Sequence, residues 1–189
     1  RESGGPGSPE ISEVEVGEHR RFLLVRQEVE KERVIAGVRD SIDRAPALKR
    51  WIEWRGQPCV SVAVGLSTAA VLDGQLYNFL PMGSEAGSPL LGHIDAPFFA
   101  DIDRRNTDLE LPLNSHLMDA VAEACVSGAL AVVREQLDIP GRSVFDLIAW
   151  TGGDARKLDA AVKAAGLKLI ELNVIPIIPT ESGEKWSNL

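Results

Sequence analysis

The stretch that decides the fold runs from Gln75 to Arg105 and reads QLYNFLPMGSEAGSPLLGHIDAPFFADIDRR. It contains an apolar segment, a loop rich in Gly, Ser and Pro, a second apolar segment, and a charged end with two adjacent arginines. Short apolar runs that are bounded by turn residues predict strands. We expect the residues before this stretch to add strands to the same sheet, and the residues after it to form a layer of helices.

Two strands and one helix are predicted on the N-terminal side. Residues 19–26 contain an apolar run, and residues 59–66 alternate valine with small side chains, which is the period of a strand. Residues 30–44 place apolar side chains at helical spacing. Asp73-Gly74 predicts a hairpin turn, with residues 75–80 as the returning strand.

Helices are predicted on the C-terminal side. A long helix is expected over residues 113–136, because Asn114 is a typical helix-opening residue and apolar side chains then repeat at helical spacing. A short helix over residues 144–150 follows, and a capping box between Ser143 and Asp146 is expected to begin it.

The predicted order places strands next to strands and helices next to helices. A third helix over residues 155–165 and a final strand over residues 168–178 complete the predicted order of elements. This order is typical of an α+β fold, so we expect a two-layer sandwich in which helices cover one face of a mostly antiparallel or mixed sheet. The expected divisions are a flexible lead-in over residues 1–16, a single domain over residues 17–179, and a tail over residues 180–189.

The composition narrows the classes of function. The chain has 189 residues and a formal net charge of −8, which disfavours a nucleic-acid partner. Its two cysteines, Cys59 and Cys125, lie in apolar runs and are expected to be reduced core residues. Without a signal peptide or an apolar run of membrane-spanning length, the sequence predicts a cytoplasmic protein with no membrane partner. The chain begins with Arg1 rather than methionine, and we expect it to be part of a longer protein.

Several residues carry candidate chemistry, and each has a structural alternative. His93 and Asp95 would share one face of a strand, as a base and its orienting carboxylate, although a structural histidine is favoured. Asp101 and Asp103 could hold a metal ion, but pairing with the adjacent arginines or exposure to solvent is favoured, and we expect no metal site. The loop over residues 81–89 could wrap a phosphate with its N–H groups, although a plain connection is favoured.

Arg104 and Arg105 are the strongest candidates for a functional role. Arginine is always charged, and its planar guanidinium group matches the oxygens of a phosphate. An arginine at the end of a strand can reach across a domain boundary to a nucleotide. Such a contact accelerates phosphoryl transfer by roughly 10³–10⁵-fold.

Trp51 and Trp54 support a second hypothesis, of a different class. Two tryptophans three residues apart in a basic segment could form a patch that binds a protein partner. The chain would then be a non-enzymatic interaction or scaffold domain. Packing over the edge of a sheet is the favoured alternative for such a pair.

The string LYNFLPMGSEAGSPLLGHIDAPFFADIDRR resembles a segment of sacsin and its plant (no-vein-like) and bacterial relatives. In that family a Y-x-F-L-P strand leads through a Gly-containing loop to an H-I/V-x-A-x-F strand and an arginine-containing turn. The following PLNSHLMDAVAEAC resembles the N-x-x-L helix of the family. The similarity covers about Gly74 to Cys125, and the matching residues are Tyr77, Phe79, Leu80, Pro81, Gly87, Pro89, His93, Ile94, Ala96, Phe98, Arg104 or Arg105, Asn114 and Leu117.

The resemblance implies a large ATPase of the GHKL group, related to the ninety-kilodalton heat-shock chaperone. In that group an N-terminal module binds ATP with Mg²⁺, and the following middle segment supplies an arginine to the terminal phosphate. The implied role of this chain is that transducer-like middle domain, with Arg104 or Arg105 at the γ-phosphate. Its implied partners are the preceding ATP-binding module of the same chain and protein clients.

The resemblance also implies that this chain does not hydrolyse ATP alone. The ATP-binding module of the group needs an Asn-bearing helix and a D-x-G-x-G loop, and neither occurs in these 189 residues. We therefore expect no cofactor within the chain itself.

Overall fold

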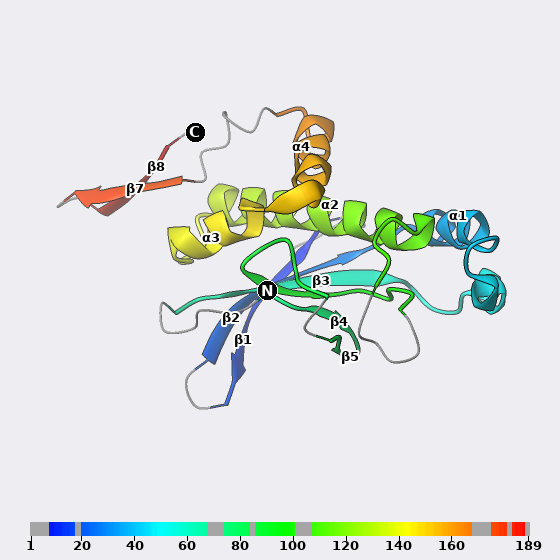
Figure 1. Ribbon diagram of the computed structural model, residues 1–189. Coiled ribbons are helices and arrows are strands. Elements are labelled where there is room, and N and C mark those ends of the chain that lie inside the picture. Colours follow the sequence, from blue (N-terminus) through cyan, green and yellow to red (C-terminus); the bar gives the residue numbers. More distant parts are fainter. Residues whose placement is uncertain are drawn as a thin grey trace.

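The computed structural model describes residues 8–17, 20–67, 74–83, 86–100 and 107–167, together with the backbone of residues 175–180 and 183–187. These residues form one mixed sheet, a layer of helices on one side of it, and a separate two-stranded sheet near the C-terminus (Figure 1). The predicted α+β class, with helices covering one face of the sheet, is therefore confirmed.

The main sheet has six strands in the spatial order β1-β2-β3-β6-β4-β5. Neighbouring strands pair antiparallel except β4 and β6, which run parallel. The strands are β1 (Glu10–Val16), β2 (Arg20–Glu28), β3 (Cys59–Gly65), β4 (Leu76–Asn78), β5 (Leu80–Pro81) and β6 (Gly92–Asp95). The second sheet pairs β7 (Ile175–Thr180) with β8 (Gly183–Ser187).

The helical layer is organised around one long helix, α2, which lies along the sheet (Figure 1). Helices α2 and α3 contact β3, and α2 also contacts β2, whereas α1 and α4 pack against α2. The helices predicted over residues 30–44, 113–136 and 155–165 are confirmed apart from their end residues. The elements are α1 (Lys31–Ser41), the 3-10 helix η1 (Pro46–Glu53), α2 (Pro112–Arg134), α3 (Gly141–Ile148), the 3-10 helix η2 (Gly152–Asp154) and α4 (Ala155–Ala164).

The core lies between the sheet and α2. In β3 the side chains of Val60, Val62 and Val64 are fully buried, and the residues between them face the other side of the sheet. Gly128 of α2 meets the sheet directly, because a Cβ atom there would lie 2.8 Å from the side chain of Val25. The missing side chain lets α2 approach β2 closely. The strand predicted over residues 59–66 from the alternation of valines is confirmed as β3.

Helix α2 is long and apolar enough to span a membrane when only length and composition are considered. However, 61% of its apolar window is buried inside the structure. Contact with the sheet on one side and with α1, α3 and α4 on others explains why the helix is apolar around most of its surface.

Strand β1 occupies residues for which the sequence predicts a flexible lead-in, so that prediction is wrong for residues 10–16. The segment is acidic, and its order comes from antiparallel pairing with β2 along its whole length. Glu13 and Arg21 form an ion pair across this ladder, and Glu10 lies 3.7 Å from Arg26. Such cross-strand pairs stabilise a strand that its own composition does not favour.

The hairpin predicted at Asp73-Gly74 is wrong in its pairing. Asp73 lies outside the described residues, but the strand that follows, β4, does not pair with β3. Strand β6 lies between them, antiparallel to β3 and parallel to β4. The fully buried Ile94 of β6 fills the position in the core that a returning hairpin strand would take. A contact between residues so far apart in sequence leaves no local signal.

The capping box predicted at Ser143 and Asp146 is also wrong. Helix α3 begins at Gly141, and no side chain caps it. The Ser143 hydroxyl instead donates a hydrogen bond of 2.7 Å to the carbonyl oxygen of Gly65, at the end of β3. Ser143 therefore connects α3 to the sheet, because its hydroxyl group bonds to a carbonyl oxygen outside its own helix.

The predicted closing strand over residues 168–178 is described only from residue 175 onward. There β7 pairs with β8, which falls within the predicted tail over residues 180–189. Within the described residues, neither strand joins the main sheet. A strand is therefore confirmed at the described end of the predicted range, and part of the predicted tail is also a strand.

Candidate functional site

The two candidate arginines, Arg104 and Arg105, lie outside the described residues. The structure describes the chain up to residue 100, shortly after β6, and again from residue 107, shortly before α2. The arginine-bearing segment therefore connects the sheet to the helical layer, and the residues on both sides of it are visible.

Asn114 joins the two sides of that segment. It is fully buried in the first turn of α2. Its Oδ1 atom accepts a hydrogen bond of 2.8 Å from the N–H of Phe99, and its Nδ2 atom donates to the carbonyl oxygens of Phe99 at 2.8 Å and Asp108 at 2.9 Å. We call these three hydrogen bonds the Asn114 clamp. One buried side-chain amide thus pairs backbone groups on either side of the arginines.

Two further contacts fix the same flanking residues. Arg44, which follows α1, donates to the carboxylate of Asp108 at 2.5 Å and to the carbonyl oxygen of Glu110 at 3.1 Å. The ring of Trp51 packs edge-on against Phe99, with 5.9 Å between the ring centroids. Contacts from η1, from α2 and from the turn between α1 and η1 therefore meet at the residues on both sides of the arginines.

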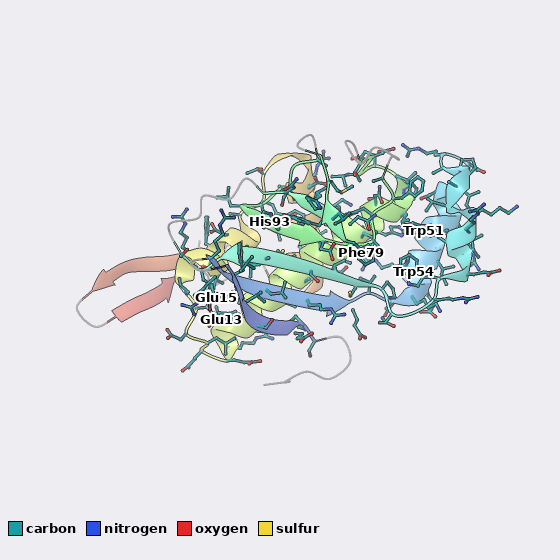
Figure 2. All side chains as sticks on the ribbon, turned by 90° about the horizontal axis from the view of Figure 1, so that it is seen from below. Glu13, Glu15, Trp51, Trp54, Phe79 and His93 are labelled. Carbon is teal, nitrogen blue, oxygen red and sulfur yellow. The ribbon has the colours of Figure 1, made fainter. Side chains whose placement is uncertain are left out.

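Trp51 and Trp54 pack against each other and against the core. Their ring centroids are 5.5 Å apart, and both side chains are partly buried. Figure 2 shows the pair at the end of the molecule where η1 lies. This arrangement agrees with the favoured interpretation of the pair as packing residues, and their role as a partner-binding patch stays a hypothesis.

The face of the sheet opposite the helices is uncovered in the described part of the chain (Figure 2). On this open face β3 presents small side chains between larger ones from β2 and β6, since Ala63 lies opposite both Leu24 and His93. The result is a shallow pocket of about 200 Å³. Its lining residues are Leu24, Ser61, Ala63, Tyr77, His93 and Asp95.

His93 and Asp95 are not joined by a hydrogen bond within the described residues. The Nδ1 atom of His93 is buried without a partner, and its ring packs edge-on against Tyr77 at 5.3 Å. Burial lowers the pKa of the imidazole, and the nearby Arg20 lowers it further. Asp95 instead accepts a hydrogen bond of 3.1 Å from the N–H of Phe79. The arrangement agrees with a structural histidine and lacks the hydrogen bond that a base and its orienting carboxylate need.

The loop over residues 81–89 is described apart from residues 84 and 85. Three of its N–H groups bond within the protein: those of Met82, Ala86 and Ser88 donate to backbone carbonyl oxygens at 3.0, 2.9 and 3.1 Å. These three paired donors are not available to a phosphate, which agrees with the favoured interpretation of the loop as a connection.

The two cysteines are free and differ in environment. Cys125 is buried in α2, as predicted, and burial raises the pKa of its thiol to about 12. Cys59 is only partly buried on the open face, where Arg26 donates to its sulfur at 3.6 Å, so the core prediction is wrong for Cys59. Among the described residues, no group of three or more His, Cys, Asp or Glu is placed to hold a metal ion.

Asn114 and Phe79 are not distinguished by any pattern of apolar or charged residues in the sequence. Asn114 is predicted only as a helix-opening residue, and Phe79 only as a strand residue. Their positions in the motif that resembles the sacsin family are the one signal that singles them out before the structure is seen.

Fold and site together define an α+β domain in which a buried amide holds both ends of an arginine-bearing connection. Comparison with protein-family models, with curated proteins and with solved structures finds no match to this chain. A functional assignment therefore depends on the geometry above and on the resemblance in the sequence.

Proposed function

We propose that this chain is the middle, transducer-like domain of a cytoplasmic sacsin-type GHKL ATPase. In this role it senses the nucleotide bound in a preceding module of the same polypeptide and relays that state to the rest of the protein. Arg104 or Arg105 contacts the γ-phosphate, whereas ATP and Mg²⁺ are held by the preceding module. The chain is not catalytic alone.

The observation that supports this proposal most directly is the Asn114 clamp. An arginine that acts on a phosphate held elsewhere needs a fixed starting point, because catalytic contacts lose their effect when they are displaced by about 1 Å. The clamp supplies fixed residues on both sides of the arginines, namely Phe99 and Asp108. Arg44, in the turn after α1, contacts Asp108, and Trp51 of η1 contacts Phe99.

The second supporting observation is that the two motif strands form one unit. The Y-x-F-L-P motif begins in β4 and ends in β5, and the H-I/V-x-A-x-F motif begins in β6. Strands β4 and β6 pair in parallel at one side of the sheet. The rings of Tyr77 and His93 meet at 5.3 Å on the open face. Residues that the resemblance singles out are therefore neighbours in space, as expected for a shared structural motif.

The test is ATP turnover by the polypeptide that contains both the ATP-binding module and this chain. Replacement of both arginines, Arg104→Ala with Arg105→Ala, should lower the turnover number by about 10³-fold, the lower end of the effect of such arginines. The single variants then identify which of the two contacts the phosphate.

The matched control removes a different pair of adjacent arginines, Arg20→Ala with Arg21→Ala on β2, and should leave turnover nearly unchanged. Equal turnover in the wild type and in the Arg104→Ala, Arg105→Ala variant would overturn the proposed role of the arginines. Hydrolysis of ATP by this chain alone would contradict the proposal that it is not catalytic.

A further inference from the structure

Strand β1 is the last strand on its side of the main sheet, and one of its two edges is free in the described part of the chain. It pairs with β2 over all seven of its residues without a break in register. The strand contains no proline and no bulge that would turn the free edge away. An edge of this kind offers a row of unpaired N–H and C=O groups to another strand.

The ladder between β2 and β3 shows which groups of β1 point to the free edge. The N–H of Leu66 donates to the carbonyl oxygen of Arg21 at 2.9 Å, so the odd-numbered residues of β2 bond to β3. The even-numbered residues of β2 therefore bond to β1, and their partners in β1 are also even-numbered. The backbone groups of Ile11, Glu13 and Glu15 consequently point outward, to the free edge.

The side chain of Glu13 lies on the covered side of the sheet. Glu13 is directly opposite Leu23 of β2, which is fully buried in the core. Ile11, on the same side of β1, packs against the core, whereas Glu13 and Glu15 are exposed (Figure 2). A charged side chain on the core side of an edge strand is one of the features by which proteins protect such edges from pairing.

A second copy of this chain carries the same free edge and could pair with it. Closed dimers have two-fold symmetry, and two β1 strands related in this way run antiparallel. The register that pairs all seven residues places Glu13 directly opposite its own counterpart, and Glu15 opposite Ile11. Registers shifted by two residues shorten the ladder, and one of them places Glu13 opposite Glu15. Like charges directly opposite each other destabilise a pair of strands.

The arginine beside Glu13 does not cancel this repulsion. Arg21 forms an ion pair with Glu13 and lies opposite Glu15, so one guanidinium group serves two carboxylates on this side of the β1–β2 pair. Two paired copies would likewise bring twice as many carboxylates as guanidinium groups to their shared edge. The added strand would also take water from these carboxylates, and a charged group loses free energy when it is desolvated without a full partner.

We propose that Glu13 keeps the free edge of β1 from pairing with a second copy of this chain. With the carboxylate in place the chain is a monomer. Without it, the edge is a dimerisation surface at which the sheet continues from one copy into the next. The inference does not depend on the proposed function, because β1 lies at the opposite side of the sheet from β4 and β5.

The experiment is sedimentation velocity of this chain over a range of protein concentrations. The wild type should sediment as a monomer. Glu13→Val replaces the carboxylate with a side chain that favours strands, and should raise the association constant of the dimer by about tenfold or more. Glu13→Gln removes the charge at nearly constant size, and should shift the same equilibrium in the same direction by a smaller factor.

The matched control is Glu10→Val. Glu10 is an exposed carboxylate on the same strand and lies 3.7 Å from an arginine of β2, Arg26. However, its side chain is on the open face, and in the full register it would lie opposite Val16 instead of another carboxylate. The control should therefore remain a monomer at concentrations at which Glu13→Val is a dimer.

A double variant tests whether the dimer forms through the edge of β1. Adding Glu15→Pro to Glu13→Val removes an N–H group that points to the free edge and leaves the hydrogen bonds to β2 in place. The double variant should be a monomer again. A dimer that persists in the double variant would overturn the inference, because it would form through another surface.

Melting curves followed by circular dichroism show that the variants are folded. Glu13→Val and Glu13→Gln should melt close to the wild type, because an exposed ion pair such as Glu13–Arg21 contributes little to stability. If Glu13→Val melts far below the wild type, Glu13→Gln decides the question. A wild type that is already a dimer, or folded Glu13 variants that remain monomers, overturn the inference.

Discussion

The two faces of the main sheet come from the same strands but differ in the size and the burial of their side chains. Toward the helices, β3 presents Val60, Val62 and Val64, all fully buried. Toward the open side it presents Ser61 and Ala63, beside the half-buried rings of Tyr77 and His93. Because side chains alternate along a strand, one short sequence supplies both surfaces.

The two faces should therefore contribute differently to the stability of the fold. The covered face carries the large branched side chains whose burial dominates folding. The open face has small side chains and a shallow pocket, and the left-handed turn at Phe79 is joined to Phe98 through a hydrogen bond from Asn78. Substitutions on the covered side should therefore change stability more than substitutions on the open side.

The largest expected contrast between the faces is the reactivity of the two cysteines. Cys59 is partly exposed on the open face, whereas Cys125 is buried in α2 and burial raises its thiol pKa to about 12. If Cys125 reacts only after global unfolding, which costs at least about 5 kcal/mol, its rate of labelling should be lower by about 10³-fold or more. Labelling with a thiol reagent at pH 8 measures both rates. Cys59→Ser should abolish the fast phase, and two fast thiols would contradict the assignment.

A core truncation should give the next largest effect. Leu117 of α2 is fully buried, and Leu117→Ala should lower the free energy of unfolding by about 2–5 kcal/mol, because it leaves a cavity above the sheet. Leu24→Ala removes the same atoms from the open face and should cost about 1 kcal/mol or less. Urea unfolding measures both values. Equal losses would show that the open face is covered in solution.

The Asn114 clamp should contribute less to the free energy of unfolding than a core side chain does, but more than an exposed amide does. Asn114→Ala leaves three backbone groups of Phe99 and Asp108 without their partner, and should lower the free energy of unfolding by about 1–3 kcal/mol. Gln57, an exposed residue whose amide donates one hydrogen bond to Val29, is the matched control, and Gln57→Ala should cost about 0.5 kcal/mol. Similar losses in urea unfolding would show that the clamp adds nothing to the fold.

The smallest expected effect concerns a carboxyl group buried in the covering layer. Burial raises the pKa of Asp146 above its ordinary value of 3.8, although Arg142 opposes the shift. The folded protein thus binds this proton more tightly than the unfolded chain, so the ionised group lowers stability above the raised pKa, and that loss disappears below 3.8. Asp146→Asn should be slightly more stable than the wild type at pH 7. The difference should shrink toward pH 3.5, and a less stable variant at pH 7 would contradict the assignment.

The elements that were predicted correctly have strong local patterns. The valines of β3 alternate with small residues, and the apolar side chains of α2 repeat at helical spacing, so burial on one face follows from the period alone. Cys125 and Leu117 are buried as the stripe on α2 predicts. The acidic β1 shows no such period, and its pairing with β2 became visible only in the structure.

The sequence selected candidate site residues by the chemistry of their side chains, but the hydrogen-bond partners of these side chains became known only from the structure. The sequence singled out His93 with Asp95 because two residues on a strand share a face, yet the carboxylate of Asp95 is bonded to the N–H of Phe79. Ser143 was predicted as a helix cap and instead reaches the carbonyl oxygen of Gly65. In each case the partner comes from a distant part of the chain, which a local pattern does not contain.

By itself the sequence determined the α+β class, the main helices and the residues that face the core, because the period of apolar side chains is a local property. Tertiary structure alone decided that β6 lies between β3 and β4, that Asn114 holds both flanks of the arginine-bearing segment, and that Phe79 is exposed on a left-handed turn. The physical reason is that strand order and buried polar pairing depend on which distant groups meet, and many pairings are compatible with one apolar pattern.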